Sequence, residues 1–546
     1  MVKSMHTRIP STLDPDFGRN AIAAIPRRYN FAEEVLARNL AAGRGSKPAY
    51  IDSRGTWTYG QLAERVARFG NLLRGLGIQR EQRILICMTD TIDWPTAFLG
   101  AVKAGVVAIS VNTLLGESEY RIILEDSRAR LLVVSEELYP LFANLIDAFP
   151  HLEHIIVSGK QGFGHALFED ALQAADTTEY TAPTICDEMC FWLYTSGSTG
   201  TPKAAVHVHA TLGLTASCYG AHVLRLKEDD VVHSVSKLSF AYGLGNSMVH
   251  PLSVGATAVL ASERPTPNSV AELLRTRGVT VLFSVPTFYT AFLAADPVER
   301  EALKLRQCLS AGEALPVNIG QSWSERFGVD ILDGLGCTET ISTFLCNREG
   351  AVRYGTSGKP VPGFDIRLVD EEGAVVAQGE MGELQVRGPT TAIMYWNDRE
   401  RSRATFQGEW LRTGDKYIQD KDGYYSYCGR RDDMMKVGGI YVSPFEVEGA
   451  LLSHPDVLEA AVAAWPDEDG LIRPKAFVVL KPSGKPNEAT ALALREHCRK
   501  QLATFKYPRW IEFRAELPKT ATGKIRRFKL REEALEDDHA GSDAAE

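Results

Sequence analysis

The sequence lacks the hydrophobic runs and the cysteine spacing that mark several large classes of protein. Its most apolar stretch, residues 98–111, is interrupted by Lys103 and falls short of the roughly 20 residues that span a bilayer. No apolar signal-peptide core follows Met1. The nine cysteines form no Cys-x-x-Cys pair, so neither a zinc site nor a disulfide framework is indicated. We therefore expect a protein without membrane contact in a reducing, cytoplasmic environment.

An excess of basic residues is also missing. Sixty basic residues stand against 69 acidic ones, which gives a formal net charge of −9, whereas nucleic-acid binders normally carry a basic surface. The composition, 45% hydrophobic and 24% charged, is that of an ordinary globular protein. At about 150 residues per domain, the 546 residues predict roughly three or four compact units. We expect no nucleic-acid partner, and any anionic ligand must be held by local groups.

The order of apolar segments predicts an α/β fold. Up to about residue 430, apolar runs of strand length alternate with helical patterns, as at 83–88, 94–104, 106–111 and 129–134. Such alternation is typical of largely parallel, buried sheets. From Gly355 onward, short strands separated by Gly, Pro and Asp turns predict a small antiparallel, β-barrel-like unit.

A polar segment separates these units from the end of the chain. Residues 429–433 read Gly-Arg-Arg-Asp-Asp, and helical patterns at 444–453 and 491–502 follow them. We predict a large N-terminal domain, residues 1–431, made of stacked α/β subdomains and the barrel-like unit. A smaller, mobile α+β domain, residues 432–546, follows, with the hinge at Asp432.

One loop has the composition of a phosphate-binding site. A strand-like run at 190–194 leads into Thr-Ser-Gly-Ser-Thr-Gly-Thr-Pro-Lys, residues 195–203. Two glycines, five hydroxyls, free backbone N–H groups and a terminal cation are the elements of an anion cradle. It is not a Walker A loop, which requires Gly-Lys followed by Ser or Thr. A flexible Ser/Gly hairpin is the alternative, but the length of the run and Lys203 favour phosphate binding.

This loop resembles the signature loop of the adenylate-forming superfamily, which includes acyl-CoA synthetases, peptide-synthetase adenylation domains and beetle luciferases. Four further motifs follow in that family's order: Asp-Gly-Leu-Gly-Cys-Thr-Glu at 333–339, Thr-Gly-Asp at 413–415, Gly-Arg-Arg-Asp at 429–432 and Pro-x-x-x-x-Gly-Lys at 518–524. The resemblance covers about residues 31–532. It implies an enzyme that activates an organic acid with ATP and Mg²⁺ and transfers it to coenzyme A.

The resemblance also implies roles for single residues. Those at the nucleotide are Thr195, Ser196, Gly197, Ser198, Thr199, Gly200, Lys203, Gly312, Glu313, Asp333, Gly334, Leu335, Asp415 and Arg430. Thr338 would contact a phosphate, Glu339 would hold Mg²⁺, which prefers oxygen ligands, and Asp415 would accept from both ribose hydroxyls. Lys524 would be catalytic, reaching between the acid and the ribose. Leu335 replaces the family's usual tyrosine, which argues against aromatic stacking on adenine there.

Further roles concern the transfer to coenzyme A. Asp432 would be the pivot about which the smaller domain rotates, because hinge residues absorb the backbone change in domain-closure enzymes. Gly438 and Gly439 would then line the pantetheine tunnel. Lys506 is a candidate for contact with a CoA phosphate.

The acid is predicted from residues 237–246, which read Lys-Leu-Ser-Phe-Ala-Tyr-Gly-Leu-Gly-Asn. This segment holds no carboxylate to pair with an ammonium group, so amino acids are disfavoured. With Val-Asn-Thr-Leu-Leu at 111–115, Ser-Ala-Gly-Glu-Ala-Leu-Pro at 310–316 and Val-Ser-Pro at 442–444, it resembles bacterial benzoate-CoA ligases. The acyl-site residues that this implies are Phe240, Ala241, Tyr242, Gly336, Ser342 and Thr343.

Several alternatives stay open. The polar run Thr-Ile-Ser-Thr at 340–343 is compatible with a hydroxybenzoate or a heteroaromatic acid such as furoate. A short- or medium-chain fatty acyl-CoA synthetase is a rival enzyme, and a non-catalytic nucleotide-binding regulator is a rival of another class. His207 and His209 would share a face of a strand, a spacing compatible with a metal, but no third ligand is evident and ordinary packing is favoured. The sequence does not decide between a monomer and a homodimer.

Overall fold

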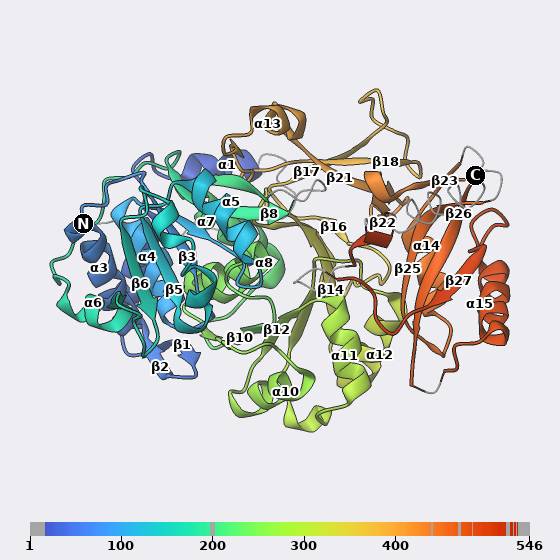
Figure 1. The fold of residues 1–546 in the computed structure, drawn as a ribbon, viewed down its shortest axis with the longest axis horizontal. Helices are drawn as coiled ribbons and strands as arrows, with labels where there is room; N and C mark the ends of the chain where they lie inside the picture. Colours follow the sequence, from blue (N-terminus) through green and yellow to red (C-terminus); the bar gives the residue numbers. More distant parts are fainter. Residues whose placement is uncertain are drawn as a thin grey trace.

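The structure is a computed structural model that describes residues 17–196, 202–437, 440–467, 471–482, 484–519, 525–527, 529–530 and 532. Two large sheets and a smaller antiparallel sheet form the N-terminal part, and a compact α+β unit forms the C-terminal part (Figure 1). This is the α/β architecture that the alternation of segments predicts. No helix in the described part of the chain has the length and apolarity needed to cross a membrane.

The first large sheet has eight strands in the order β19-β9-β8-β4-β3-β5-β6-β7. Its strands are β3 (Arg83–Cys87), β4 (Val107–Ser110), β5 (Leu131–Ser135), β6 (His154–Ser158), β7 (Ala166–Leu167), β8 (Met189–Ser196), β9 (Pro202–Val208) and β19 (Met394–Tyr395). From β8 to β7 the pairing is parallel, whereas β9 runs antiparallel to both β8 and β19. β4 and β5 are buried at every position, which explains their continuous apolar sequence.

Helices cover both faces of this first sheet. They are α3 (Tyr59–Gly75), α4 (Asp93–Ala104), α5 (Glu117–Ser127) and α6 (Phe168–Ala174). The helix α3 begins at a capping box made by Thr58 and Gln61. Phe69, Phe98 and Phe168 pack in one core on one face of the sheet, while Ile123 of α5 packs in another core. The sheet is therefore buried between helices, as parallel sheets require.

The second large sheet has nine strands in the order β16-β15-β14-β13-β12-β10-β11-β1-β2. They are β1 (Pro48–Asp52), β2 (Gly55–Thr58), β10 (Val231–Ser234), β11 (Thr257–Val259), β12 (Val281–Ser284), β13 (Gln307–Ser310), β14 (Ile331–Gly336), β15 (Thr343–Cys346) and β16 (Lys359–Pro360). The strands from β1 to β14 along this order pair in parallel. Their carboxyl ends therefore meet at one edge, which is where α/β sheets bind ligands.

Helices also bury the second sheet. One face is covered by α10 (Pro267–Thr276), α11 (Pro286–Ala295) and α12 (Val317–Phe327), with Trp323 at the centre of their core. The main core of the protein joins both large sheets through helices in residues 209–254. These helices are α7 (His209–Thr215), η3 (Ala216–Leu224), α8 (Ala241–Leu244), η4 (Gly245–Val249) and α9 (His250–Val254). In Figure 1, α8 lies near the middle of the molecule.

The turn-rich segment forms an antiparallel sheet of β17 (Asp365–Val369), β18 (Met381–Arg387), β20 (Phe406–Gln407), β21 (Trp410–Gln419) and β22 (Tyr425–Arg430). The short strands and their antiparallel pairing agree with the prediction. Within the described strands the pairing does not close into a ring, so the unit is an open sheet. A helix, α13 (Arg399–Thr405), stands between β19 and β20.

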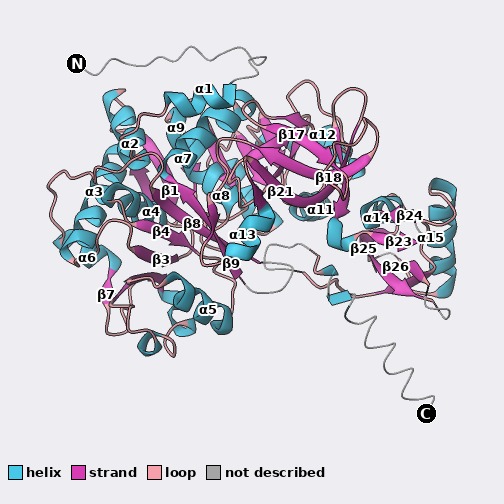
Figure 2. Ribbon diagram, turned by 90° about the horizontal axis from the view of Figure 1, so that it is seen from above, coloured by secondary structure: helices cyan, strands magenta, loops and turns pink. Residues whose placement is uncertain are grey.

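The smaller C-terminal domain has its own core. It contains β23 (Met435–Val437), β24 (Ile440–Val442), α14 (Pro444–Leu452), β25 (Val457–Pro466), β26 (Ile472–Leu480), α15 (Glu488–Gln501) and β27 (Trp510–Phe513). Val447, Leu451, Val478 and Leu494 pack together in that core. Figure 2 shows this domain at one end of the molecule, beside the antiparallel sheet. Asp432 lies in the short turn η6 (Arg431–Asp433) that connects β22 to β23.

Candidate functional site

The predicted phosphate loop lies between two strands of a hairpin. β8 and β9 are antiparallel neighbours, with Thr195 opposite Lys203 and Ser196 opposite Pro202. The hairpin is continued by β19, where Tyr395 pairs with Ala205. Of the predicted phosphate ligands, Gly197, Ser198, Thr199 and Gly200 lie outside the described residues. The described part of the loop thus ends on Lys203, whose side chain is 20% exposed.

The side chain of Lys203 lies beside that of Glu339, the predicted metal ligand. Lys203 Nζ is 3.5 Å from Glu339 Oε1 and 2.7 Å from the hydroxyl of Tyr395, and that hydroxyl is 2.5 Å from the same Glu339 oxygen. Burial opposes the ionisation of Glu339, but Lys203 and Tyr395 outweigh it and lower the pKa of this carboxyl. Glu339 is therefore an ionised carboxylate, and carboxylate oxygens are suitable ligands for Mg²⁺.

The backbone on both sides of this carboxylate is anchored. His207 Nε2 lies 2.9 Å from the carbonyl oxygen of Thr338, and Ala392 N donates to the carbonyl of Glu339 at 2.7 Å. Burial lowers the pKa of His207 to about 4, so the ring is neutral, and a carbonyl only accepts. The proton therefore sits on Nε2. The ring also stacks on Phe191 at 4.8 Å.

The expectation that His207 and His209 share a strand face is wrong. β9 ends at Val208, and His209 is the first residue of the helix α7, so the alternation of a strand does not continue to it. Both rings are buried. Across the residues that the structure describes, no group of three or more His, Cys, Asp or Glu side chains is arranged to hold a metal.

Several of the predicted nucleotide-binding residues lie at the ends of β13 and β14. Ser310 and Asp333 are parallel partners, and Gly312, with φ +98°, lies two residues after the end of β13 with Glu313 next to it. Asp333 is buried, and burial raises the pKa of its carboxyl to about 8. Its Oδ1 atom has no hydrogen-bond partner among the described atoms. A buried carboxyl oxygen without a partner is suited to a hydrogen bond with a ligand.

Two glycines of β14 let the next strand approach closely. A Cβ on Gly334 would lie 2.8 Å from Cγ2 of Thr343, and one on Gly336 would lie 2.7 Å from the carbonyl oxygen of Ser342. Between them, Leu335 packs against the main core. The predicted acyl residues Gly336, Ser342 and Thr343 are thereby brought together where β14 meets β15.

Two hydroxyls of the polar run at 340–343 form hydrogen bonds within its own turn. Thr340 Oγ1 donates to the carbonyl of Ser342 at 2.9 Å, and Ser342 Oγ donates to that of Thr343 at 3.4 Å. Ile341 between them has φ +49°. The polarity of this run therefore stabilises a strained turn, which weakens it as an argument for a polar substituent on the acid.

The start of α8 forms the other side of the predicted acyl-binding site. Phe240 precedes the helix, Ala241 and Tyr242 open it, and the ring of Tyr242 stands edge-on to Phe283 of β12 at 6.3 Å. The Tyr242 hydroxyl is buried without a partner among the described atoms. The segment is fixed from outside the predicted site by the buried carboxylate of Asp90, which accepts from Leu238 N at 3.1 Å.

The predicted ribose ligands face each other across two strands. Asp415 in β21 pairs with Arg430 in β22, and Arg430 Nη1 donates to Asp415 Oδ1 at 3.0 Å and to the carbonyl of Thr413 at 3.1 Å. Burial lowers the pKa of Arg430, but the charges of Asp415 and Glu339 are among those that raise it overall. The predicted ribose ligands and the predicted metal ligand are thus close enough to interact electrostatically.

The remaining predicted residues belong to the C-terminal domain. Lys524, Gly438 and Gly439 lie outside the described residues. The chain on either side of Lys524 is held by a bridge between Lys519 and Ile525 and by Arg526 N, which donates to the carbonyl of Pro518 at 2.7 Å. Lys506 Nζ contacts both carboxylate oxygens of Glu446 at 2.7 Å, so a CoA phosphate would have to compete with this ion pair.

Sequence reasoning did not find Tyr395, Asp90 or the role of His207. Tyr395 is 192 residues from Lys203 and is brought to it only because β19 joins β9. Asp90 follows β3 and meets residue 238 across the interface of the two large sheets. No motif spacing connects such positions, since each pair is formed by the tertiary fold.

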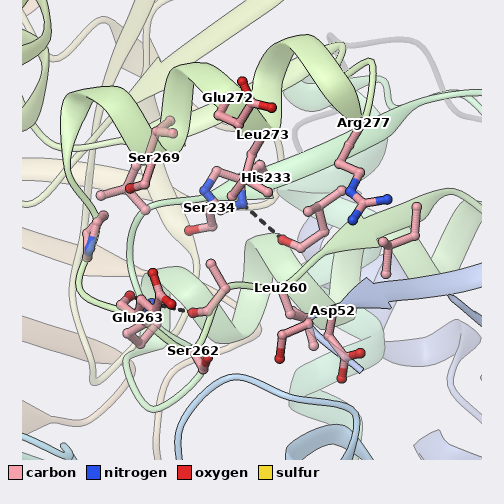
Figure 3. A pocket seen from close by; sticks show the side chains of 18 residues that line it. Asp52, His233, Ser234, Leu260, Ser262, Glu263, Ser269, Glu272, Leu273 and Arg277 are labelled. Atoms are coloured by element: carbon pink, nitrogen blue, oxygen red, sulfur yellow. Dashed lines mark hydrogen bonds between the residues drawn. The ribbon is translucent and has the colours of Figure 1, made fainter. Parts of the chain in front are cut away.

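A cavity of about 240 Å³ lies apart from these residues, at the carboxyl ends of β1, β10 and β11 under α10 (Figure 3). Its lining includes Asp52, His233, Leu260 and Glu272, and no predicted site residue. His233 Nδ1 lies 2.9 Å from the carbonyl of Val259. The cavity is therefore separate from the candidate site.

Comparisons with known proteins agree with the motifs. A family model described as AMP-binding enzyme matches residues 37–396, and one described as AMP-binding enzyme C-terminal domain matches residues 446–524. The chain is 56% identical to a benzoate–CoA ligase of Thauera aromatica, over 93% of this chain and 96% of the relative. It is 47% identical to a 4-hydroxybenzoate–CoA/benzoate–CoA ligase of Rhodopseudomonas palustris, over 93% and 95%.

Solved structures give the same result. The structure of a benzoate CoA ligase from Burkholderia xenovorans is matched with a TM-score of 0.86 and 48% identity, over 92% of this chain and all of that one. An anthranilate CoA ligase in complex with anthranoyl-AMP is matched with a TM-score of 0.89 and 44% identity, over 94% and 98%.

Proposed function

Because the chain belongs to the AMP-binding, adenylate-forming enzymes, in their benzoate-CoA ligase-like subfamily, we propose that it joins an aromatic carboxylic acid to coenzyme A through an acyl-adenylate. ATP and CoA are the co-substrates. The observation that carries the proposal is the cluster of Lys203, Glu339 and Tyr395 at one end of the site, with Asp415 and Arg430 near it.

The first half-reaction needs positive charge. A carboxylate is a poor acyl donor, so its oxygen attacks the α-phosphorus of ATP, and the acyl-adenylate and pyrophosphate are formed. Two anions must meet, so cationic groups and hydrogen-bond donors have to converge on the phosphates. Lys203 and Thr338 are suited to this role, and we propose that Lys524 completes it from the smaller domain. The acid arrives ionised, so no general base is required.

Mg²⁺ fits the donor set near Glu339. The ion pair with Lys203 and the hydrogen bond from Tyr395 both use Oε1, so we propose Oε2 as the oxygen for the ion. A bound magnesium ion would supply positive charge to the phosphate oxygens. We propose Glu339 as its protein ligand.

In the second half-reaction the thiolate of coenzyme A attacks the acyl carbon, and AMP leaves. We propose that the smaller domain rotates about Asp432 between the two steps, which withdraws Lys524 and brings Gly438 and Gly439 to the pantetheine. The independent core of that domain supports this proposal, because a unit that packs on itself can move as a body.

We propose benzoate, or a benzoate with a small substituent, as the acid. Phe240, Ala241 and Tyr242 offer an apolar and aromatic wall, and the hydroxyls of Thr340 and Ser342 are engaged in their own turn. The names of the matched relatives, which refer to benzoate, 4-hydroxybenzoate and anthranilate, support an aromatic acid. A cytoplasmic location fits a reaction that consumes ATP and coenzyme A.

The test is CoA-dependent AMP release with benzoate, hydroxybenzoates, aminobenzoates, furoate and a series of aliphatic acids. We expect the highest kcat/KM for benzoate or a monosubstituted benzoate. A preference for an aliphatic acid of six or more carbons would instead identify a fatty acyl-CoA synthetase. ATP binding without pyrophosphate exchange with any acid would identify a non-catalytic regulator. Sedimentation of the same preparation distinguishes a monomer from a homodimer.

A further inference from the structure

We propose that Tyr395 is a positioning residue for the magnesium–ATP complex: its hydroxyl separates Lys203 from Glu339 and orients the carboxylate before the nucleotide arrives. This inference rests on the proposed function, because it concerns the same phosphate site. Tyr395 belongs to none of the five motifs that define the site. Its position is known only from the fold.

The direction of each hydrogen bond follows from chemistry alone. An ammonium group only donates and an ionised carboxylate only accepts. Lys203 Nζ must therefore donate to Tyr395 Oη at 2.7 Å, and Tyr395 must give its single proton to Glu339 Oε1 at 2.5 Å. The three groups form a chain that runs one way, from the cation through the hydroxyl to the anion.

Tyr395 is held firmly enough to act as a fixed point. Its side chain is 2% exposed and its ring packs on Phe406 at 5.2 Å. Its backbone pairs with Ala205, two residues after Lys203, and its N–H donates to Ser402 Oγ at 2.9 Å. The ammonium of Lys203 also lies 4.1 Å from the centre of the ring. The ring therefore holds the lysine even without the hydroxyl.

The hydroxyl prevents a competing contact. Lys203 Nζ and Glu339 Oε1 are 3.5 Å apart, and the hydroxyl lies within hydrogen-bond distance of both. Without it, the ammonium and the carboxylate would close into a direct ion pair. That pair would have to be broken before phosphate could take the lysine and a cation could take the glutamate. With the hydroxyl present, Glu339 keeps one bond when Lys203 turns to phosphate.

The test is binding of Mg²⁺·ATP to Tyr395→Phe, measured by calorimetry without any acid, so that it does not depend on turnover. Loss of a charge-assisted hydrogen bond corresponds to about tenfold weaker binding. We expect the Kd for Mg²⁺·ATP to rise about tenfold, with a smaller change for ATP in EDTA. In a Glu339→Gln background the same substitution should have little further effect, because the carboxylate that it orients is gone.

A matched control is available on β8, on the other side of β9 in the same sheet. Tyr194 Oη donates to Asp126 Oδ2 at 2.6 Å, so Tyr194→Phe also removes a hydroxyl from a carboxylate. It should leave Mg²⁺·ATP binding within about twofold. Thioester formation from supplied acyl-adenylate should be unchanged in Tyr395→Phe, because that step uses no triphosphate.

Three outcomes would overturn the inference. They are unchanged Mg²⁺·ATP binding in Tyr395→Phe, an equal loss in Tyr194→Phe, and an equal loss of both half-reactions. Failure of the proposed function is distinguishable from these, since it would appear in the wild-type chain as ATP binding without pyrophosphate exchange.

Discussion

His207 donates from Nε2 to the carbonyl oxygen of Thr338 at 2.9 Å and thereby ties the strand that follows the phosphate loop to the residue before the predicted metal ligand. The ring is buried and neutral, and it stacks on Phe191. Lys203 and Glu339 are thus coupled twice, through their side chains and through the backbone next to them. These contacts connect the two halves of the proposed phosphate site.

Replacing His207 by Phe should keep the stacking on Phe191 but leave a buried carbonyl without its donor. Such a loss costs about 1–3 kcal/mol. We expect adenylation, measured as pyrophosphate exchange, to fall about tenfold. His209→Phe is the control, because His209 begins the next helix and neither of its ring nitrogens has a hydrogen-bond partner among the described atoms. An equal loss in the control, or stoichiometric zinc in the purified protein, would contradict the assignment.

Lys524→Ala should abolish most of the first half-reaction and spare the second. Removing one donor to transition-state charge lowers a rate by about 10²–10³. Pyrophosphate exchange should fall by at least that factor, while thioester formation from synthetic acyl-adenylate should stay within about threefold. Lys519→Ala serves as the control, because its ammonium is paired with Glu459 at 2.7 Å within the same domain. If both half-reactions fall equally, Lys524 is not specific to adenylation.

Asp432→Pro should restrict rotation at the turn between β22 and β23, since proline fixes φ. We expect CoA-dependent thioester formation to fall about tenfold or more, with pyrophosphate exchange much less affected. The two rates are measured on the same preparation. If neither rate changes in this variant, residue 432 is not the pivot.

The buried carboxyl of Asp333 should make stability depend on pH. Burial raises its pKa to about 8, from an ordinary value near 3.8, so the folded chain retains a proton that the unfolded chain releases. Stability from this group is complete below about pH 4 and is lost as the pH rises toward 8. Asp333→Asn does not titrate. The increase in melting temperature of this variant over the wild type should therefore be larger at pH 8 than at pH 5. An equal increase at both pH values would refute the raised pKa of Asp333.

The fold was predictable where burial leaves a direct mark on the sequence. β3, β5 and β6 are parallel strands under helices, so they read as short apolar runs, and α4 ends at Gly105 with φ +72°, a conformation that favours glycine. The motifs predicted a set of residues that would share one nucleotide site. Those that the structure describes, such as Lys203 with Glu339 and Asp415 with Arg430, lie together.

The rest was not predictable because it depends on which strands become neighbours. Tyr395 belongs to the two-residue strand β19, which is too short to leave a pattern in the sequence and is defined by its pairing with β9. Asp90 supports the acyl segment from another sheet. The change from strand to helix between His207 and His209 was missed because apolar and polar residues alternate through both. Local pattern therefore predicted the candidate ligands, whereas the side chains that contact them come from tertiary pairing.

The pairing of Arg430 with Asp415 has a consequence for the order of events in catalysis. Arg430 precedes residue 432 by two positions and is bonded to Asp415 and to the carbonyl of Thr413 on the adjacent strand. If the smaller domain rotates about residue 432 as proposed, this arginine and its partner stay in place. The proposed nucleoside site would then remain intact through both half-reactions, while the C-terminal domain presents different faces to the acyl group.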